Sequence, residues 1–196
     1  DAMGKLLVHK AGPGPKLMFA AHMDSIGIVA THIDEKGFVR FGKVGGVEPC
    51  GIAQANLRFR SGRMGVVSVK EPQADKAFKL DDLYLDLGAK DKAEAENWVC
   101  PGDTAAFTGA VYQNGDCIVS PYLDNRVGCL VLLLALAESK NTVNDITFAF
   151  TVQEEVGLRG AKTAAFAVQP DYAVVVDTTD PCDVPDSLMS GNTVLG

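Results

Sequence analysis

The sequence predicts an α/β fold with a small, mostly β insertion. Three short apolar runs are typical of buried strands, because they are rich in β-branched and aromatic residues and are bounded by polar or turn-forming residues. These runs are residues 16–21, 146–152 and 172–176. After residue 120 the pattern alternates between helix and strand with short connections, which implies parallel pairing and right-handed crossovers.

Composition limits the possible functions. The 196 residues are 47% hydrophobic, enough for one substantial core and a smaller second one. The net charge is −7 and no run of basic residues occurs, which argues against nucleic acid as a partner. Five widely spaced cysteines without a C-x-x-C pair indicate neither a disulfide framework nor a zinc knuckle, so we expect a reducing cytoplasm.

Membrane association is not expected. The longest apolar segment, Val127 to Ala137, is too short to cross a bilayer and predicts a buried helix. Residues 1–5 carry no signal-peptide h-region.

The N-terminal part predicts a strand at residues 5–9, the strand at 16–21 and a further apolar run at 26–31. His22 follows the second of these and is either a metal ligand or a structural histidine. Asp24 is either a turn residue or the carboxylate that fixes the tautomer of a metal-bound His22.

Residues 41–118 form the predicted insertion. Alternating runs at 55–60 and 64–69 flank a Gly-containing turn and predict a β-hairpin. Residues 82–87 predict another strand, and residues 91–98 predict a short helix. A β surface of this kind often supports self-association.

The α/β pattern then returns, with helices expected at 127–139 and 160–168 between the strands already described. Asp124 and Asn125 precede the first helix and are residue types that favour the N-cap. On local evidence alone, capping is the preferred interpretation of both.

Glu154 and Glu155 follow the strand at 146–152. Neighbouring carboxylates are costly to bury without partners, and a divalent cation removes that cost. If Glu155 binds metal, Glu154 can act as a general base; the alternative is an exposed turn. Because ligands bind at the carboxyl ends of strands in open α/β sheets, the strand ends that carry His, Glu and Asp predict a metal site.

Four segments resemble, in order, the signature segments of the M42 family of metallo-aminopeptidases. The segments are residues 21–27, 123–128, 152–161 and 176–179. The resemblance extends over nearly the entire chain and includes Gly45-Gly46 and residues 83–88.

This resemblance implies two divalent metals, zinc or cobalt and alternatively manganese. The implied ligands are His22, Asp124, Glu155 and Asp177. Asp124 would bridge the metals, which replaces the local preference for a cap. Glu154 would be the general base and Asp24 the partner of His22. Whether Glu155 or Asp177 shares a metal with His22 stays open.

The implied activity is removal of N-terminal residues from peptides through a water activated by both metals. Residues 1–40 and 119–196 would form a partial α/β/α catalytic domain that lacks its C-terminal part. Residues 41–118 would be a dimerisation domain, through which dimers build a tetrahedral dodecamer.

Three features depart from the family pattern. Ser25 stands where the family has an acidic residue, and Thr178 stands where a small apolar residue is commoner. Family members are also longer, and their downstream part supplies a final histidine ligand, whereas no histidine follows His32 here. Either the chain is a fragment, or water and a neighbouring subunit complete the site. The alternatives are therefore an incomplete fragment acting as an assembly module, or a related di-metal deacetylase or carboxypeptidase.

Overall fold

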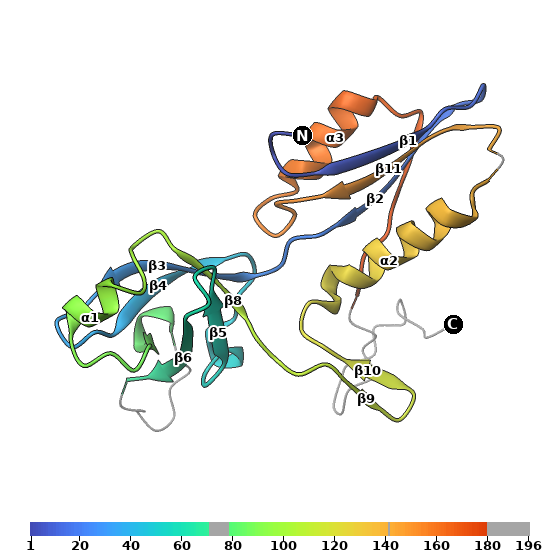
Figure 1. Cartoon of the computed structure of the whole chain (residues 1–196). Coiled ribbons are helices and arrows are strands. Elements are labelled where there is room, and N and C mark those ends of the chain that lie inside the picture. Colours follow the sequence, from blue (N-terminus) through green and yellow to red (C-terminus); the bar gives the residue numbers. More distant parts are fainter. Residues whose placement is uncertain (71–78, 141, 180–196) are drawn as a thin grey trace. The chain divides into compact units, whose positions relative to one another are not determined.

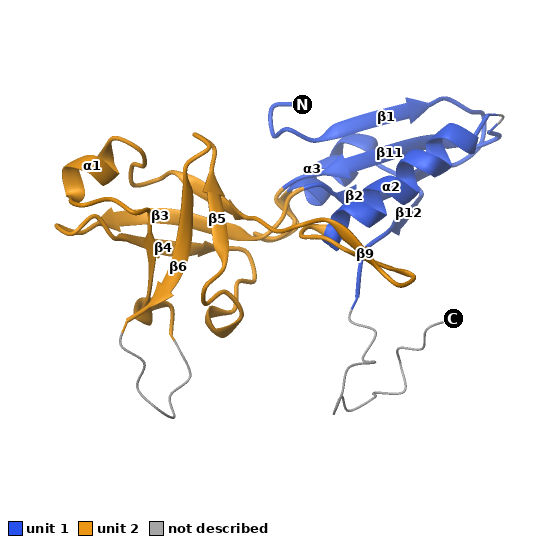
Figure 2. Cartoon of the chain, turned by 60° about the horizontal axis from the view of Figure 1, so that its bottom comes forward, with its two compact units in different colours: residues 1–23, 123–152, 160–196 blue, residues 24–122, 153–159 orange. Residues whose placement is uncertain are grey.

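The computed structural model describes residues 1–70, 79–140 and 142–179. The chain divides into two compact units, which Figure 2 colours separately. The sheet unit comprises residues 1–23, 123–152 and the chain from 160 onward, and the barrel unit comprises residues 24–122 and 153–159. Within the described residues, no helix is long and apolar enough to span a membrane.

The sheet unit is built on four strands in the order β1-β11-β2-β12, of which Figure 1 labels the first three and Figure 2 labels all four. Their bounds are Leu6–Lys10 for β1, Asp145–Thr151 for β11, Lys16–His22 for β2 and Tyr172–Val175 for β12. β2 pairs parallel with both β11 and β12, as the sequence predicts, and β1 pairs antiparallel with β11. The register places Thr151 opposite His22, so two parallel strands end side by side.

Two helices pack against this sheet on opposite faces: α2, Leu123–Glu138, and α3, Arg159–Val168. Ala21 of β2 packs in one buried cluster with Cys129 and Leu132 of α2. Ala20, the next residue along the strand, packs with Ala164 of α3. Because successive strand residues point to opposite faces, the unit has the α/β/α layering that was predicted.

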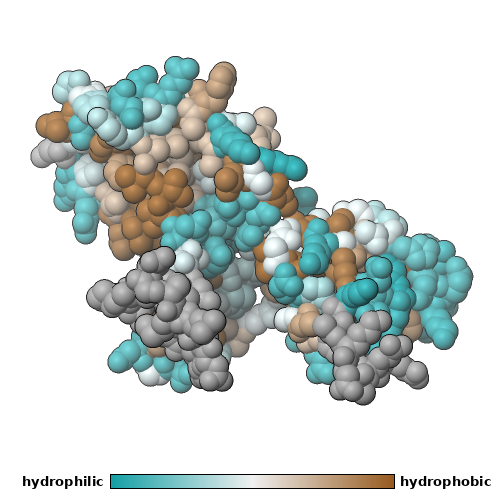
Figure 3. All heavy atoms as spheres, turned by 180° about the vertical axis from the view of Figure 1, so that it is seen from behind, coloured by the Kyte–Doolittle hydropathy of each residue, from teal (hydrophilic) through white to brown (hydrophobic). Residues whose placement is uncertain are grey.

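The prediction of a buried helix over 127–137 is wrong for most of α2. Only one stripe of the helix faces the sheet, and it includes Cys129 and Leu132. Leu136 is partly buried against the same cluster, and the other large apolar side chains from 127 to 137 are exposed, with Leu134 56% exposed. The exposed ones are Val127, Leu130, Val131, Leu133 and Leu134. The hydrophobic area on this unit in Figure 3 shows that apolar side chains gather on its surface.

The barrel unit contains a closed barrel in the order β3-β4-β7-β6-β5-β8. Its strands are Gly27–Ile33, Val39–Val44, Leu83–Asp86, Met64–Val69, Asn56–Phe59 and Thr104–Phe107, in that order. Inward residues such as Ile28, Leu57 and Leu85 are fully buried in one hydrophobic cluster. Closure of the barrel pairs every strand on both sides and leaves no open edge.

The barrel unit also contains short helices and a hairpin. The 3₁₀ helices η1 and η2 span Pro49–Gly51 and Leu80–Asp82, and helix α1 spans Lys92–Glu96. Asp91 caps α1 by accepting a hydrogen bond from the Glu94 amide, which explains the helix predicted at 91–98. Strands β9 (Tyr112–Asn114) and β10 (Cys117–Val119) pair with each other.

The predicted hairpin is confirmed as β5 and β6, and the predicted strand at 82–87 as β7. The barrel unit begins at residue 24, whereas the sequence placed the start of the insertion at 41. The difference arises because β3 pairs with both β4 and β8 and so belongs to the barrel. The dimerisation role of this part of the chain stays a prediction.

Candidate active site

In the sheet unit, His22 faces two carboxylates. Its side chain is only 3% exposed, at the end of β2. Its Nε2 lies 3.1 Å from Oδ1 of Asp124 and 3.6 Å from Oδ1 of Asp177. These three residues come from three segments far apart in the sequence, so their meeting is a product of the fold.

Strand pairing places Asp177. β12 runs parallel to β2, and the Val176 amide continues the ladder by donating to the Ala20 carbonyl at 2.9 Å. Asp177 therefore emerges at the carboxyl end of the sheet, beside His22. Its Oδ1 also accepts a hydrogen bond of 2.8 Å from the Thr178 amide.

Asn125 positions the start of α2. Its side chain is buried, donates to the Val176 carbonyl at 2.8 Å and accepts from the Gly128 amide at 3.0 Å. The second bond makes Asn125 the N-cap of the helix, because the cap side chain accepts from the amide three residues on. A Cβ on Gly128 would lie 2.2 Å from Asn125 Oδ1, so glycine is required there. Asn125 thereby ties the helix start to the strand end that carries Asp177.

Asp124 does not cap the helix. The cap bond to the Gly128 amide comes from Asn125, and the Asp124 carboxylate faces His22 instead. Of the two residues that local sequence favours as caps, only Asn125 takes that role.

The donor set around His22 fits a divalent cation. Zinc, cobalt and manganese accept imidazole nitrogen and carboxylate oxygen together. Two ligand atoms each about 2.1 Å from one tetrahedral cation lie roughly 3.4 Å apart, close to both distances measured from Nε2. A cation would also offset the like charges of Asp124 and Asp177.

In the barrel unit, Asp24 holds the backbone of the two adjacent glutamates. Its Oδ1 accepts from the Glu154 amide at 3.1 Å, and its Oδ2 accepts from the Glu155 amide at 3.3 Å. Hydrogen bonds to a charged acceptor are stronger than those between neutral groups. One carboxylate therefore fixes the backbone from which both glutamate side chains project.

The turn after these glutamates is tightly closed. The Glu154 carbonyl accepts from the amides of Gly157 and Leu158, both at 2.9 Å. Gly157 has a φ of 116°, which favours glycine. Gly45 has a φ of 81°, and a Cβ on it would lie 3.0 Å from Glu155 Cβ. The close approach of the glutamate turn thus explains Gly45 of the motif pattern, whereas a Cβ on Gly46 would meet no atom within 4 Å.

The structure therefore gathers the predicted site residues within each unit. His22, Asp124 and Asp177 meet in the sheet unit, and Asp24 contacts the Glu154 and Glu155 backbone in the barrel unit. The role assigned to each residue stays a prediction.

Sequence reasoning missed two contributions from α2. It treated Asn125 only as a helix cap, although the same side chain also holds Val176. It gave no role to Cys129, whose thiol donates to the His22 carbonyl at 3.1 Å. Burial raises the pKa of the Cys129 thiol, although the nearby Arg126 opposes that rise. The raised pKa keeps the thiol protonated, so that it can donate the hydrogen bond. No local sequence signal marks a cysteine for this contact.

The chain is similar to known aminopeptidases over nearly its whole length. Residues 4–196 match the family described as M42 glutamyl aminopeptidase. A putative aminopeptidase of Acetivibrio thermocellus is 48% identical over 188 residues, which cover 95% of this chain and 57% of the relative. These matches confirm the resemblance seen in the four motifs.

Solved structures agree with this assignment. An aminopeptidase from the archaeon Desulfurococcus kamchatkensis aligns with a TM-score of 0.90 at 39% identity, covering 97% of this chain and 55% of that one. The Pyrococcus horikoshii TET1 peptidase, which can assemble into a tetrahedron or a large octahedral shell, aligns with a TM-score of 0.82 at 34% identity, covering 94% and 61%. The chain therefore spans about half the length of the proteins it matches.

Proposed function

The chain belongs to the M42 glutamyl aminopeptidase family, and on that basis we propose that it carries the metal-binding part of an enzyme that removes N-terminal residues from peptides. The observation that supports this most is the buried His22 imidazole, whose Nε2 faces Asp124 and Asp177. One imidazole nitrogen and two carboxylate oxygens 3.1 and 3.6 Å from it, brought together from distant segments, are a donor set that suits a divalent cation.

Two divalent ions are proposed, with zinc, cobalt or manganese as candidates. The proposed ligands are His22, Asp124, Glu155 and Asp177, with Asp124 shared between the ions. Three of these, His22, Asp124 and Glu155, each offer a ligand atom suited to a divalent ion. The segment that carries both glutamates follows β11 in the chain. A hydrogen bond from the Gly160 amide to the Val152 carbonyl joins the two ends of this segment.

The bound ions would supply Lewis acidity toward the scissile carbonyl and the attacking water. Glu154 accepts the proton of that water and passes it to the leaving amine. Asp24 positions the backbone that carries Glu154 by accepting a hydrogen bond from the Glu154 amide. Substrates are peptides with a free N-terminus.

Self-association is proposed through the barrel unit. The TET1 peptidase assembles into closed shells, and this chain is 34% identical to it. For the full-length protein we propose dimers that form through the barrel unit. These dimers would then build a tetrahedral assembly.

Metal analysis and turnover test this proposal together. We expect the chain to bind two equivalents of zinc or cobalt by elemental analysis, and Asp124→Ala to lose them. The chain should hydrolyse an aminoacyl p-nitroanilide and leave its N-acetylated form intact. Metal that binds equally well to the Asp124→Ala variant contradicts the proposed site. Bound metal without turnover in a stable oligomer favours an assembly module, and cleavage of the acetylated substrate favours a deacetylase or carboxypeptidase.

A further inference from the structure

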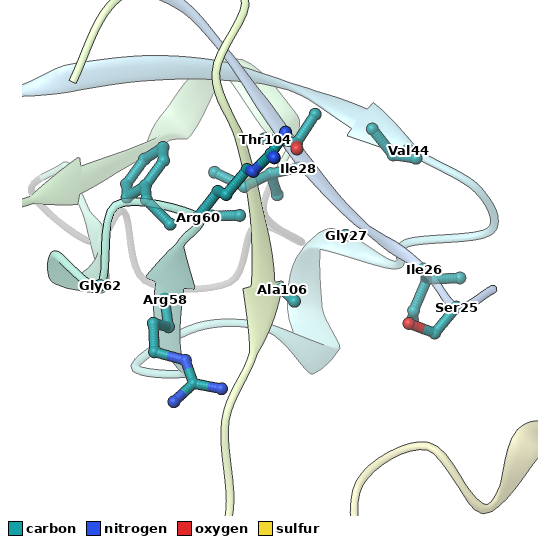
Figure 4. A pocket seen from close by; sticks show the side chains of 12 residues that line it. Ser25, Ile26, Gly27, Ile28, Val44, Arg58, Arg60, Gly62, Thr104 and Ala106 are labelled. Atoms are coloured by element: carbon teal, nitrogen blue, oxygen red, sulfur yellow. The ribbon is translucent and has the colours of Figure 1, made fainter. Parts of the chain in front are cut away.

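The outer surface of the barrel unit contains a pocket of about 580 Å³ along strands β3, β5 and β8 (Figure 4). This volume lies within the range of small-ligand sites. Its lining includes Ser25, Gly27, Arg58, Arg60, Thr104 and Ala106. We call this surface the arginine pocket.

Strand register explains the hollow. Arg58 pairs with Ala106, Ala106 pairs with Gly27, and Gly27 pairs with Val44. Directly paired residues share one face of a sheet, so these four form a row across the outside of the barrel. The two middle positions carry a methyl group and a hydrogen, which leaves a low floor between Arg58 and Val44. Figure 4 shows Ala106 between Arg58 and the Ser25–Ile26 pair.

The pocket is cationic. Arg58 lies in β5 and Arg60 directly follows the strand, and both alternate with the buried Leu57 and Phe59, so both side chains lie on the outside. The lining contains no acidic residue. Because the whole chain carries a net charge of −7, this positive surface is a local exception.

Neither arginine is occupied by a structural contact within the described part of the chain. Two other arginines of the same unit have such contacts: Arg40 donates to the Leu83 carbonyl at 3.1 Å, and Arg63 lies over the Trp98 ring at 3.3 Å. No ion pair or hydrogen bond of Arg58 or Arg60 occurs among the described residues, so both guanidinium groups are available to an anion. A guanidinium group binds a carboxylate through two parallel hydrogen bonds.

The pocket adjoins the glutamate turn within the same unit. Ser25 lines the pocket, and its neighbour Asp24 holds the amides of Glu154 and Glu155. Ser25 lies two residues before Gly27, the first residue of β3, and Gly27 lies two strand spacings from Arg58. Together these steps place Ser25 about 12 Å from Arg58. That distance is roughly the length of three or four residues of an extended peptide.

We propose that the arginine pocket binds a carboxylate of the peptide substrate a few residues downstream of the scissile bond. Arg58 and Arg60 donate to that carboxylate, which is either the C-terminus of a short peptide or an acidic side chain. This inference rests on the proposed peptidase function and adds a substrate class to it. Short peptides and peptides with an acidic residue near position four are the preferred substrates.

Binding of peptides that resist hydrolysis tests the pocket independently of catalysis. The probes are Ala-Ala-Ala-Ala, its C-terminal amide, and Ala-Ala-Ala-Glu amide, each with the first peptide bond reduced to CH₂–NH. Calorimetry on the whole chain measures the affinity for each probe. The probe whose carboxylate the pocket accepts should bind about tenfold more tightly than the Ala-Ala-Ala-Ala amide, which has no carboxylate. The first and third probes separate a C-terminal carboxylate from an acidic side chain.

Arg58→Gln and Arg60→Gln should each remove most of that preference and leave binding of the plain amide unchanged. Lys36→Gln, which removes one positive charge from the β3–β4 turn of the same unit, is the matched control and should change nothing. Circular dichroism melting verifies that each variant is folded.

Three outcomes overturn the proposal: equal affinity for all probes, a preference that survives both arginine substitutions, or arginine variants that change only the oligomeric state measured by light scattering. The last result makes the surface an interface between copies. Turnover of the unmodified peptides, measured in parallel, separates the two proposals. An arginine-dependent preference without turnover refutes the peptidase function alone, and turnover without the preference refutes the pocket alone.

Discussion

The sheet unit and the barrel unit differ in what they bury. Among the described residues, every buried polar or charged side chain belongs to the sheet unit: Lys5, His22, Asn125, Thr147 and Thr151. The barrel core is a single cluster of apolar side chains. Buried polar groups are costly unless they have partners. In the sheet unit two of these side chains, His22 and Asn125, belong to the candidate site, so that part of its core serves the site as well as the packing.

The two units also differ in what they expose. The barrel is closed, and apolar side chains that its unit exposes include Tyr112 and Ile118 of the β9–β10 hairpin. The sheet unit exposes the apolar outer side of α2 and all four residues of β12. Substitutions should therefore act differently in the two units. Those near the sheet edge should affect metal binding and turnover, and those in the barrel core should affect stability alone.

The largest expected effect is that of Glu154→Gln. Loss of a general base lowers turnover by about 10²–10⁴-fold. Metal content should not change, because the amide keeps the shape of the side chain and Glu154 is not a proposed ligand. Steady-state kinetics with elemental analysis measures both, and full activity in this variant would remove Glu154 from the mechanism.

The next largest effect should be that of Leu85→Ala, and it should appear in stability. Leu85 is fully buried in the barrel, and truncating such a leucine costs about 2–5 kcal/mol of unfolding free energy. Trp98, the only tryptophan, packs in the barrel unit, so its fluorescence reports the loss during denaturant unfolding. Zinc affinity of the folded variant should equal that of the wild type. A weaker zinc affinity would show that the two units are energetically coupled. It would contradict the expectation that barrel-core substitutions affect stability alone.

The sequence predicted those strands of the sheet unit that a continuous run of apolar side chains marks. The runs at 16–21, 146–152 and 172–176 were each placed to within a residue or two. The first two are apolar because β2 and β11 are covered on both faces, whereas β12 was expected to be buried and is exposed along its length. Strand β8, with the sequence Thr-Ala-Ala-Phe, was not predicted because small residues carry little strand preference. Barrel closure, which depends on distant pairing, fixes it instead.

The site was predictable in part for a similar reason. Polar residues at strand ends marked His22 and Asp177, because parallel strands end at a common edge. The role of Asn125 was not predictable, because its second partner, the Val176 carbonyl, lies 51 residues away in the chain. Likewise, composition predicts burial for the whole apolar run of α2, and only the fold shows that the sheet covers one stripe of it.

Asn125→Ala should have an intermediate effect on both the unfolding free energy and the zinc affinity. It removes the cap of α2 and leaves the Val176 carbonyl without its donor, at a cost of about 1–3 kcal/mol in unfolding free energy. Because Asn125 also fixes the segments that carry Asp124 and Asp177, zinc affinity should fall about tenfold. Thermal melting with zinc titration measures both quantities. A destabilised variant with unchanged zinc affinity would limit Asn125 to a structural role.

The smallest effect should come from Leu134→Ser, and it bears on what the exposed side of α2 contributes. Leu134 is 56% exposed and Leu132, two residues earlier on the same helix, is 1% exposed. In this chain Leu134→Ser should change the unfolding free energy by no more than about 0.5 kcal/mol, since surface substitutions away from specific contacts have small effects. Leu132→Ala, the matched control, should cost about 2–5 kcal/mol because it leaves a cavity against the sheet. Helix melting followed by circular dichroism compares the two. A large loss in Leu134→Ser would mean that the exposed side of α2 already has a partner in solution.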